Sequence, residues 1–146
     1  MPKTKFLEIM HQPLERATGT LKATIMGSGN RIGELYQKGS SRLFFPKNFS
    51  KTMECVLVNT AGGITGGDKF KCSIKASEES SILVTTQASE KVYRAINGSA
   101  EVETQLSISK NSKLVWLPQD TILFSESNLS RKITIHIEDG AEFLAF

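Results

Sequence analysis

Two strand-like segments of the chain are joined by the stretch Asn59-Thr60-Ala61-Gly62-Gly63-Ile64-Thr65-Gly66-Gly67-Asp68. Glycine loses more conformational entropy on folding than any other residue, so two Gly-Gly pairs indicate a backbone that needs positive φ or the close approach of another group. For the same reason we expect positive φ to exclude valine at Gly63 or Gly66. A phosphate-binding loop is not indicated, because neither G-x-x-x-x-G-K-[ST] nor G-x-G-x-x-G is present here. We therefore interpret this glycine loop, Asn59 to Asp68, as a shaped bend with one carboxylate at its exit.

Outward from the glycine loop, short segments alternate apolar and polar residues with the period of a half-buried strand. The clearest apolar faces are Leu21-Ala23-Ile25, Phe70-Cys72-Ile74-Ala76 and Ile133-Ile135-Ile137. Arg31 to Gln37 is predicted to return as a partner of the first of these strands, and Asn97-Gly98 is the strongest hairpin signal. With polar turns between the segments and no convincing helix, the pattern predicts an all-β fold. The rhythm carries no sequence repeat, so periodicity by itself does not predict a solenoid.

Length and composition indicate a single β-rich domain over residues 1–146, with residues 1–19 as an irregular lead-in. The chain is 39% hydrophobic and 23% charged, which is typical of a soluble globular protein. A net charge of +3 without a basic block argues against nucleic acid as a partner. No apolar run approaches the ~20 residues of a membrane helix, and the first residues lack the apolar core of a signal peptide. We predict a cytoplasmic protein that binds neither nucleic acid nor membrane.

No arrangement of reactive side chains predicts an enzyme. The two histidines, His11 and His136, have no metal-ligand spacing, and His136 is predicted to be exposed. A serine nucleophile in a G-x-S-x-G context is also missing. Cys55 and Cys72 lie on separate strand-like segments, where a disulfide requires suitable pairing and two reduced thiols are favoured.

Three stretches concentrate the remaining polar and aromatic residues. They are the glycine loop, the segment Thr85 to Arg94 and the segment Trp116 to Thr121. Each has an ordinary structural interpretation beside a functional one: a tight turn, a solvated strand end and core packing of Trp116, respectively.

Together the three stretches resemble the urease accessory proteins of the UreD (also called UreH) family. They read N-T-A-G-G-I-T-G-G-D, T-T-Q-A-S-E-K-V-Y-R and W-L-P-Q-D-T-I-L-F, and they follow a basic and aromatic segment at residues 37–46. The resemblance covers most of residues 20–146. It implies stacked β-sheets, β-helix-like or sandwich-like, with little or no helix in this portion. Family members are roughly twice as long, so the chain is expected to be the N-terminal part of a longer fold.

The resemblance also implies a function. It implies a non-enzymatic chaperone that helps to load nickel into the urease apoprotein, together with a helical accessory protein and a GTPase. No tightly bound cofactor is expected, only transient Ni²⁺. Because the chain ends in the apolar segment at residues 143–146, we expect the isolated chain to expose a strand edge and to self-associate.

A scaffold that delivers nickel must also release it, which favours carboxylates, hydroxyls and water over clusters of imidazole or thiolate. The carboxylates in or beside the three stretches are Asp68, Glu90 and Asp120, our candidates for lining a transient nickel path. Each of them could equally cap a turn or pair with a cation.

Other residues of the three stretches are expected to shape the loops. Gly62, Gly63, Gly66 and Gly67 would allow close packing, and Lys91, Tyr93 and Arg94 would set the loops or neutralise the acids. The remaining candidates of this kind are Trp116, Pro118 and Gln119. The alternative function is a non-catalytic β-rich module that binds protein or carbohydrate, with Trp116, Tyr93 and Phe124 as stacking surface.

Overall fold

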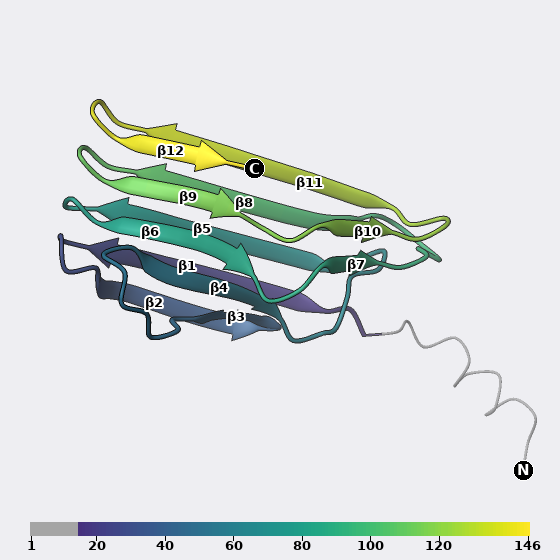
Figure 1. Ribbon diagram of the computed structural model, residues 1–146. Coiled ribbons are helices and arrows are strands. Elements are labelled where there is room, and N and C mark those ends of the chain that lie inside the picture. Colours follow the sequence, from purple (N-terminus) through teal and green to yellow (C-terminus); the bar gives the residue numbers. More distant parts are fainter. Residues whose placement is uncertain (1–14) are drawn as a thin grey trace, which may run out of the picture.

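The structure, a computed structural model, describes residues 15–146 as twelve strands without a helix (Figure 1). Within that range, therefore, no helix is long and apolar enough to cross a bilayer. The strands are β1 (Thr18–Met26), β2 (Arg31–Gly39), β3 (Ser41–Phe44), β4 (Met53–Asn59), β5 (Lys69–Ser77), β6 (Ser81–Thr86), β7 (Glu90–Val92), β8 (Ala100–Ile108), β9 (Lys113–Leu117), β10 (Thr121–Leu123), β11 (Leu129–Ile137) and β12 (Glu142–Ala145). An irregular lead-in was predicted for residues 1–19, and the part of it up to residue 14 lies outside the described residues. Its end was placed too late, because β1 already begins at Thr18.

Two five-stranded sheets face each other, and a two-stranded sheet closes one end (Figure 1). The first sheet has the order β11-β8-β5-β1-β2, the second sheet β12-β9-β6-β4-β3, and the corner sheet β10-β7. From β5 onward the chain visits the first, second and corner sheets in turn, and each strand pairs in parallel with its counterpart one circuit later. Lys69 pairs with Glu101 and Lys113 with Glu142, so successive coils are 32 and 29 residues apart. The prediction of a stacked, β-helix-like fold is confirmed.

The coils share a turn geometry that the sequence does not reveal as a repeat. Ser80, Ser112 and Ala141 each donate a backbone hydrogen bond to the carbonyl three residues earlier, at 3.0 to 3.2 Å. The residue before each of these donors has positive φ, and it is Glu79, Asn111 and Gly140 in the three coils. Three different residue types adopt the same positive φ, so the turn repeats from coil to coil although the amino-acid sequence does not.

The first strands form an antiparallel cap at one end of the stack. β1 pairs with β2 and β3 pairs with β4, both antiparallel, whereas β1 and β4 pair in parallel with β5 and β6. The predicted return of Arg31 to Gln37 as a partner strand is therefore confirmed.

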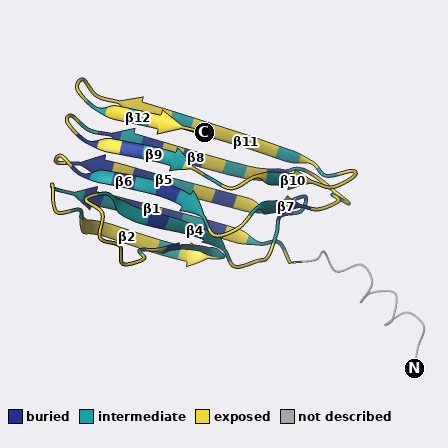
Figure 2. Ribbon diagram, in the orientation of Figure 1, coloured by how far each residue is buried: buried dark blue, intermediate teal, exposed yellow. Residues whose placement is uncertain are grey.

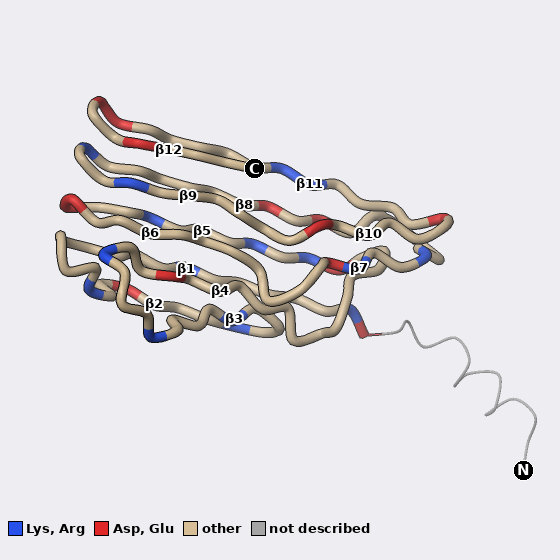
Figure 3. The backbone as a smooth tube through the Cα atoms, viewed as in Figure 1, with Lys and Arg blue, Asp and Glu red and all other residues tan. Residues whose placement is uncertain are grey.

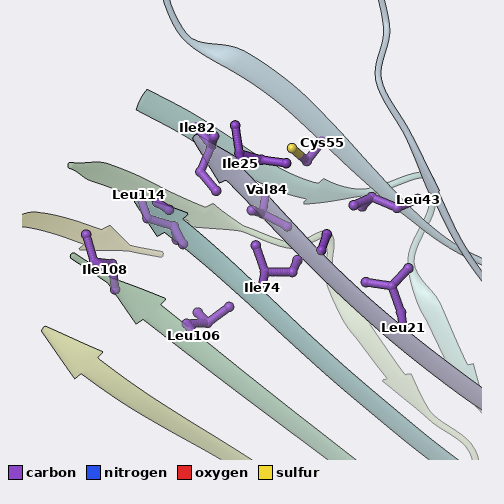
Figure 4. Close-up of a cluster of buried hydrophobic side chains, with 12 residues drawn as sticks. Leu21, Ile25, Leu43, Cys55, Ile74, Ile82, Val84, Leu106, Ile108 and Leu114 are labelled. Atoms are coloured by element: carbon purple, nitrogen blue, oxygen red, sulfur yellow. The ribbon is translucent and has the colours of Figure 1, made fainter. Parts of the chain in front are cut away.

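The main core fills the space between the two sheets at the end where the tight turns lie. Figure 4 shows side chains from both sheets pointing into this space, with Ile25 and Ile74 opposite Ile82 and Val84. The predicted faces that begin at Leu21 and at Phe70 are confirmed as the sides turned toward the core.

The outermost coil, formed by β11 and β12, is largely exposed, as is β2 at the opposite end of the stack (Figure 2). Ile133, Ile135 and Ile137 are 43%, 40% and 53% exposed, so the prediction that they form a buried face is wrong. They have the same inward phase as the buried side chains of β8, but β11 has a neighbouring strand on one side only.

The prediction of a hairpin at Asn97-Gly98 is also wrong. Gly98 has φ of 72°, as a tight turn requires, but the turn leads from β7 in the corner sheet to β8 in the first sheet. Both flanking strands pair in parallel with other coils, so the chain changes sheet here and does not reverse within one.

Candidate functional site

Toward the corner sheet, the space between the sheets opens into a cavity of about 330 Å³, which is lined by polar side chains as well as apolar ones. This inter-sheet cavity is lined by parts of all three stretches that carry the resemblance. The glycine loop contributes Asn59, Gly62 and Ile64; the second stretch Thr86, Gln87, Ala88, Ser89, Glu90 and Lys91; and the third Trp116, Pro118, Gln119 and Thr121. Segments far apart in sequence thus meet here because the coils stack them in register.

The glycine loop is the corner segment of the coil that precedes β7. Ile64 forms a parallel bridge with Val92, in which its amide donates to the Lys91 carbonyl and its carbonyl accepts from the Tyr93 amide, both at 2.8 Å. Asn59 shapes the start of the loop, since its Oδ1 accepts from the Ala61 amide at 2.9 Å and its Nδ2 donates to the Gly63 carbonyl at 3.2 Å. The loop is therefore fixed against the next coil.

The four glycines of the loop are required for two different reasons. Gly62 and Gly67 have φ of 78° and 90°, which other residues rarely adopt. A Cβ at Gly63 would lie 2.4 Å from the Tyr93 ring, and one at Gly66 would lie 2.5 Å from the Asn97 carbonyl oxygen. Gly66 has no positive φ, so the reason we predicted for excluding valine there is wrong, and close approach of the next coil replaces it.

Asp68 is a buried anchor and does not line the cavity. Its side chain is 4% exposed, with Oδ1 accepting from the Ala17 amide at 2.9 Å and Oδ2 from the Thr65 amide at 2.8 Å. The carboxylate thus ties the exit of the glycine loop to the segment that leads into β1. These contacts agree with the alternative interpretation, in which Asp68 caps a turn.

The three candidate carboxylates do not come together. Asp120 is exposed, and its backbone carbonyl accepts from the Glu90 amide at 3.0 Å while its side chain stays outside the lining. Among residues 15–146, no group of three or more His, Cys, Asp or Glu side chains could hold a metal ion. Of Asp68, Glu90 and Asp120, only Glu90 contributes to the cavity.

Glu90 is a half-buried acid with a cation in its surroundings. Burial raises the pKa of Glu90, while a hydrogen bond from Asn59, the charge of Arg131 and the Lys91 amide act in the opposite direction. The Asn59 Nδ2 lies 3.4 Å from Glu90 Oε1. Arg131 is held in place by Thr121, whose Oγ1 accepts from Nη1 at 2.8 Å.

Sequence reasoning did not identify Arg131 as part of the site. The signal was nevertheless present, because Arg131 lies in phase with Leu129 and Ile133 on the inward face of β11. A charged residue in the apolar phase of a strand is unusual and suggests a polar region in the interior.

Cys72 also lines the cavity, as a neutral thiol. Burial raises the pKa of Cys72 to about 12, so the thiolate that would bind a metal is scarce at neutral pH. Burial, together with the charge of Glu54, likewise raises the pKa of Cys55 to about 12. Both cysteines are free, as predicted, and they belong to different sheets.

Tyr93 and Arg94 lie on the outside of the corner, where they join successive coils. The Tyr93 ring stacks on Phe124 with centroids 5.2 Å apart and 19° between the planes, and Arg94 forms an ion pair with Glu126. Trp116, in contrast, packs against the main core and lines the cavity. The three rings considered as a stacking surface therefore divide into an outer pair and one inner ring.

Comparison with known proteins identifies the family to which the chain belongs. The sequence model of the UreD urease accessory protein matches residues 15–146. The chain is 44% identical over 127 residues to a urease accessory protein UreD of Rhizobium leguminosarum bv. trifolii, covering 87% of this chain and 46% of the relative. It is 40% identical over 134 residues to the protein of the same name from Brucella suis, with 90% and 48% covered.

The chain thus spans about half the length of the curated relatives it matches. The family resemblance of the three stretches is confirmed, and these stretches are the ones that converge on the inter-sheet cavity. The chain belongs to the UreD urease accessory protein family.

Proposed function

We propose that this chain takes part in urease maturation in the cytoplasm, as a non-catalytic scaffold that assists the insertion of nickel into the urease apoprotein. The observation that carries the proposal is the convergence of all three stretches on one cavity whose only carboxylate, within the described chain, is Glu90. Membership of the UreD family supports the role in maturation.

The chemistry of the cavity suits a cation in transit. Glu90 offers one carboxylate, and Asn59, Thr86 and Gln119 add amide and hydroxyl oxygens. Ni²⁺ binds imidazole and thiolate strongly, so these few oxygen donors, in a lining that also contains apolar side chains and the protonated Cys72, would hold it weakly. Arg131 would oppose a resident cation and so favour its release.

Six backbone amides of the glycine loop are already occupied by hydrogen bonds within the chain. The amides of Ala61, Ile64 and Thr65 donate to acceptors of the chain itself, as do those of Gly62, Gly67 and Asp68. A phosphate cradle needs free amides that point at the ligand. Under this proposal, GTP chemistry would belong to the GTPase accessory protein, and the helical accessory protein would join the same assembly.

The proposal is tested in cells that carry urease and its accessory genes, with the gene for this chain deleted and then restored. We expect Glu90→Gln to lower urease activity and the nickel content of purified urease, because glutamine keeps the shape of the side chain but removes its charge. Asp120→Asn is the matched control and should leave both quantities near the wild-type level, because Asp120 lies beside Glu90 in the neighbouring coil but outside the cavity lining. Normal nickel loading with Glu90→Gln would remove the support for a path through the cavity.

The alternative of a protein- or carbohydrate-binding module has one supporting observation, the exposed stack of Tyr93 on Phe124. Under that alternative, Tyr93→Ala should abolish partner binding while Glu90→Gln has no effect. Pull-down of urease and its accessory proteins with both variants separates the two functions.

A further inference from the structure

The loop that joins β3 to β4 presents an aromatic side chain to solvent. Phe49 has a relative exposure of 111%, the highest of any large apolar residue in the described chain, so its ring is left uncovered. Phe45, at the start of the same loop, packs instead against the main core. This cap loop, residues 45–52, lies at the edge of the stack beside β2 (Figure 1). One end of the loop is thus anchored while its middle projects.

Hydrogen bonds on both sides of Phe49 fix the shape of the cap loop. The Asn48 side chain donates from Nδ2 to the Thr52 carbonyl at 3.1 Å, and its Oδ1 accepts from the Ser50 amide at 3.3 Å. The Ser50 Oγ in turn accepts from the Thr52 amide at 3.0 Å. The residues that flank the ring are therefore tied to one another.

The cap loop is also tied to the body of the protein, through Asn30 in the turn before β2. The Asn30 Nδ2 donates to the Lys51 carbonyl at 2.7 Å, and its Oδ1 accepts from the Ser81 amide at 2.8 Å. The hydroxyls of Thr52 and Ser81 lie 3.0 Å apart in a further hydrogen bond. A loop that is already ordered loses little conformational entropy when it binds a partner, so an anchor on it binds efficiently.

The surroundings of the cap loop are basic. The loop contains Lys47 and Lys51 and no acidic residue, and Arg31 begins the neighbouring strand β2. The cap as a whole, residues 15–59, has seven basic and three acidic residues, whereas residues 60–146 have nine and eleven. Figure 3 shows basic residues along β2, β3 and the loop. The four ion pairs of the described chain all lie in the second range, so they leave the cations of the cap unpaired.

The acidic residues on the strands beside the cap loop do not offset this charge. Glu34 pairs in register with Thr24, which puts it on the outer side of the first sheet. Glu54 precedes the buried Cys55 and therefore lies on the outer side of the second sheet. Neither carboxylate forms an ion pair with the loop. The surface around Phe49 is thus complementary to negative charge.

We propose that the cap loop docks a protein partner whose surface has an apolar pocket rimmed by Asp and Glu side chains, with Phe49 as the anchor. Binding energy at protein interfaces is concentrated in a few anchors, often aromatic, that fill a pocket inside a polar rim. A ring that projects from an ordered loop between two lysines has this arrangement. The unpaired cations select an acidic surface and speed the encounter with it.

The same features are too few for a lipid or nucleic-acid surface. Recognition of anionic lipid by charge uses clusters of about four to eight Lys and Arg residues, and the loop has two. Nucleic acid is bound by a basic patch or stripe, which the sequence around the loop does not form. None of residues 45–52 lines the inter-sheet cavity, so the docking surface is separate from the proposed nickel path.

The test measures binding of the purified chain to three purified probes: the urease apoprotein, the helical accessory protein and the GTPase. These probes rest on the proposed function. Surface plasmon resonance at low and high salt gives the dissociation constants, and we expect the wild type to bind at least one probe, more weakly at high salt. Phe49→Ala should weaken that binding by at least about thirtyfold. Lys47→Glu/Lys51→Glu should weaken it to a similar extent, because the reversed charges repel an acidic rim.

Each variant has a matched control. Ile96→Ala also removes an apolar side chain from an exposed loop, since Ile96 is 74% exposed between β7 and β8. Lys22→Glu/Lys75→Glu reverses two exposed lysines on β1 and β5, away from the loop. Both controls should keep the affinity within about threefold of the wild type. Far-ultraviolet circular dichroism establishes that every variant is folded.

Three outcomes would overturn the proposal. They are a wild-type chain that binds none of the three probes, an affinity that is unchanged in Phe49→Ala, and binding to phosphatidylserine vesicles that Phe49→Ala abolishes, which would indicate a membrane surface. Nickel loading of urease in cells with Glu90→Gln reads the proposed function separately. A failure of the docking surface is therefore distinguished from a failure of the nickel path.

Discussion

Replacing Asp68 by alanine separates a structural role from a role in nickel transit. The substitution removes a carboxylate that is 4% exposed and accepts two backbone hydrogen bonds, from Ala17 and Thr65. A hydrogen bond to a charged group contributes about 1.5–3 kcal/mol, so losing two would cost at most ~6 kcal/mol. Because Ala17 is only half-buried, water can reach part of this region, and we expect a loss of about 3 kcal/mol.

The assay is urea unfolding followed by circular dichroism at neutral pH. With a denaturant slope of about 2 kcal/mol per M, the midpoint should fall by roughly 1.5 M. Asp120→Ala, at an exposed carboxylate, is the control and should change stability by no more than about 0.5 kcal/mol. In cells, urease activation by Asp68→Ala should decline only as far as the amount of folded protein does. Wild-type stability combined with a loss of nickel loading would refute this reasoning and restore Asp68 to the nickel path.

Three further results are expected. Gly66→Ala should destabilise the fold by about 2 kcal/mol in thermal or urea unfolding, because its Cβ would lie 2.5 Å from the Asn97 carbonyl oxygen; a neutral effect would show that the two coils separate easily. Glu90 has a folded-state pKa above its usual value of 4.5, so its contribution to stability is fully present below pH 4.5 and is lost as the pH rises through the folded-state pKa. Glu90→Gln should therefore be more stable than the wild type at pH 7 but not at pH 4, and an equal difference at both values would contradict the burial of this acid. Cys55, which is fully buried and has a pKa of about 12, should react with a thiol reagent at pH 8 only as fast as the chain unfolds, and rapid modification of the native protein would show an accessible thiolate.

Strand positions could be predicted from the sequence because alternation is a local property. Phe70 to Ala76 has the period of a half-buried strand, and β5 follows it closely. The parallel pairing of coils could not be predicted, because a column of the interior requires compatible volumes and not identical residues. One such column contains four different residue types at paired positions: Leu21, Cys72, Thr104 and Ile133.

The candidate site was predicted in part. The structure brings parts of the three stretches together at one cavity, and the functional role of that region stays a prediction. Which carboxylate faces the cavity could not be inferred, because Glu90 and Asp120 differ only in how the corner strands orient them. The burial of Asp68 could not be inferred either, because one of its two amide partners is Ala17, fifty-one residues earlier in the sequence.

The even spacing of the coils has a consequence for how the chain acquires its structure during synthesis. From β5 onward, partners 29 to 32 residues apart give nearly the same loop-closure entropy for each coil, whereas β1 and β5 pair across 51 residues, from Thr18 to Lys69. A separation of about 30 in 146 residues is a relative contact order of ~0.2, which is typical of domains that fold in milliseconds to seconds. A ribosome adding about 5–20 residues per second needs roughly 2–6 s for one coil. Each coil thus has time to settle on its predecessor before the next emerges, and the antiparallel cap of β1 to β4 becomes the template on which the growing chain is laid down.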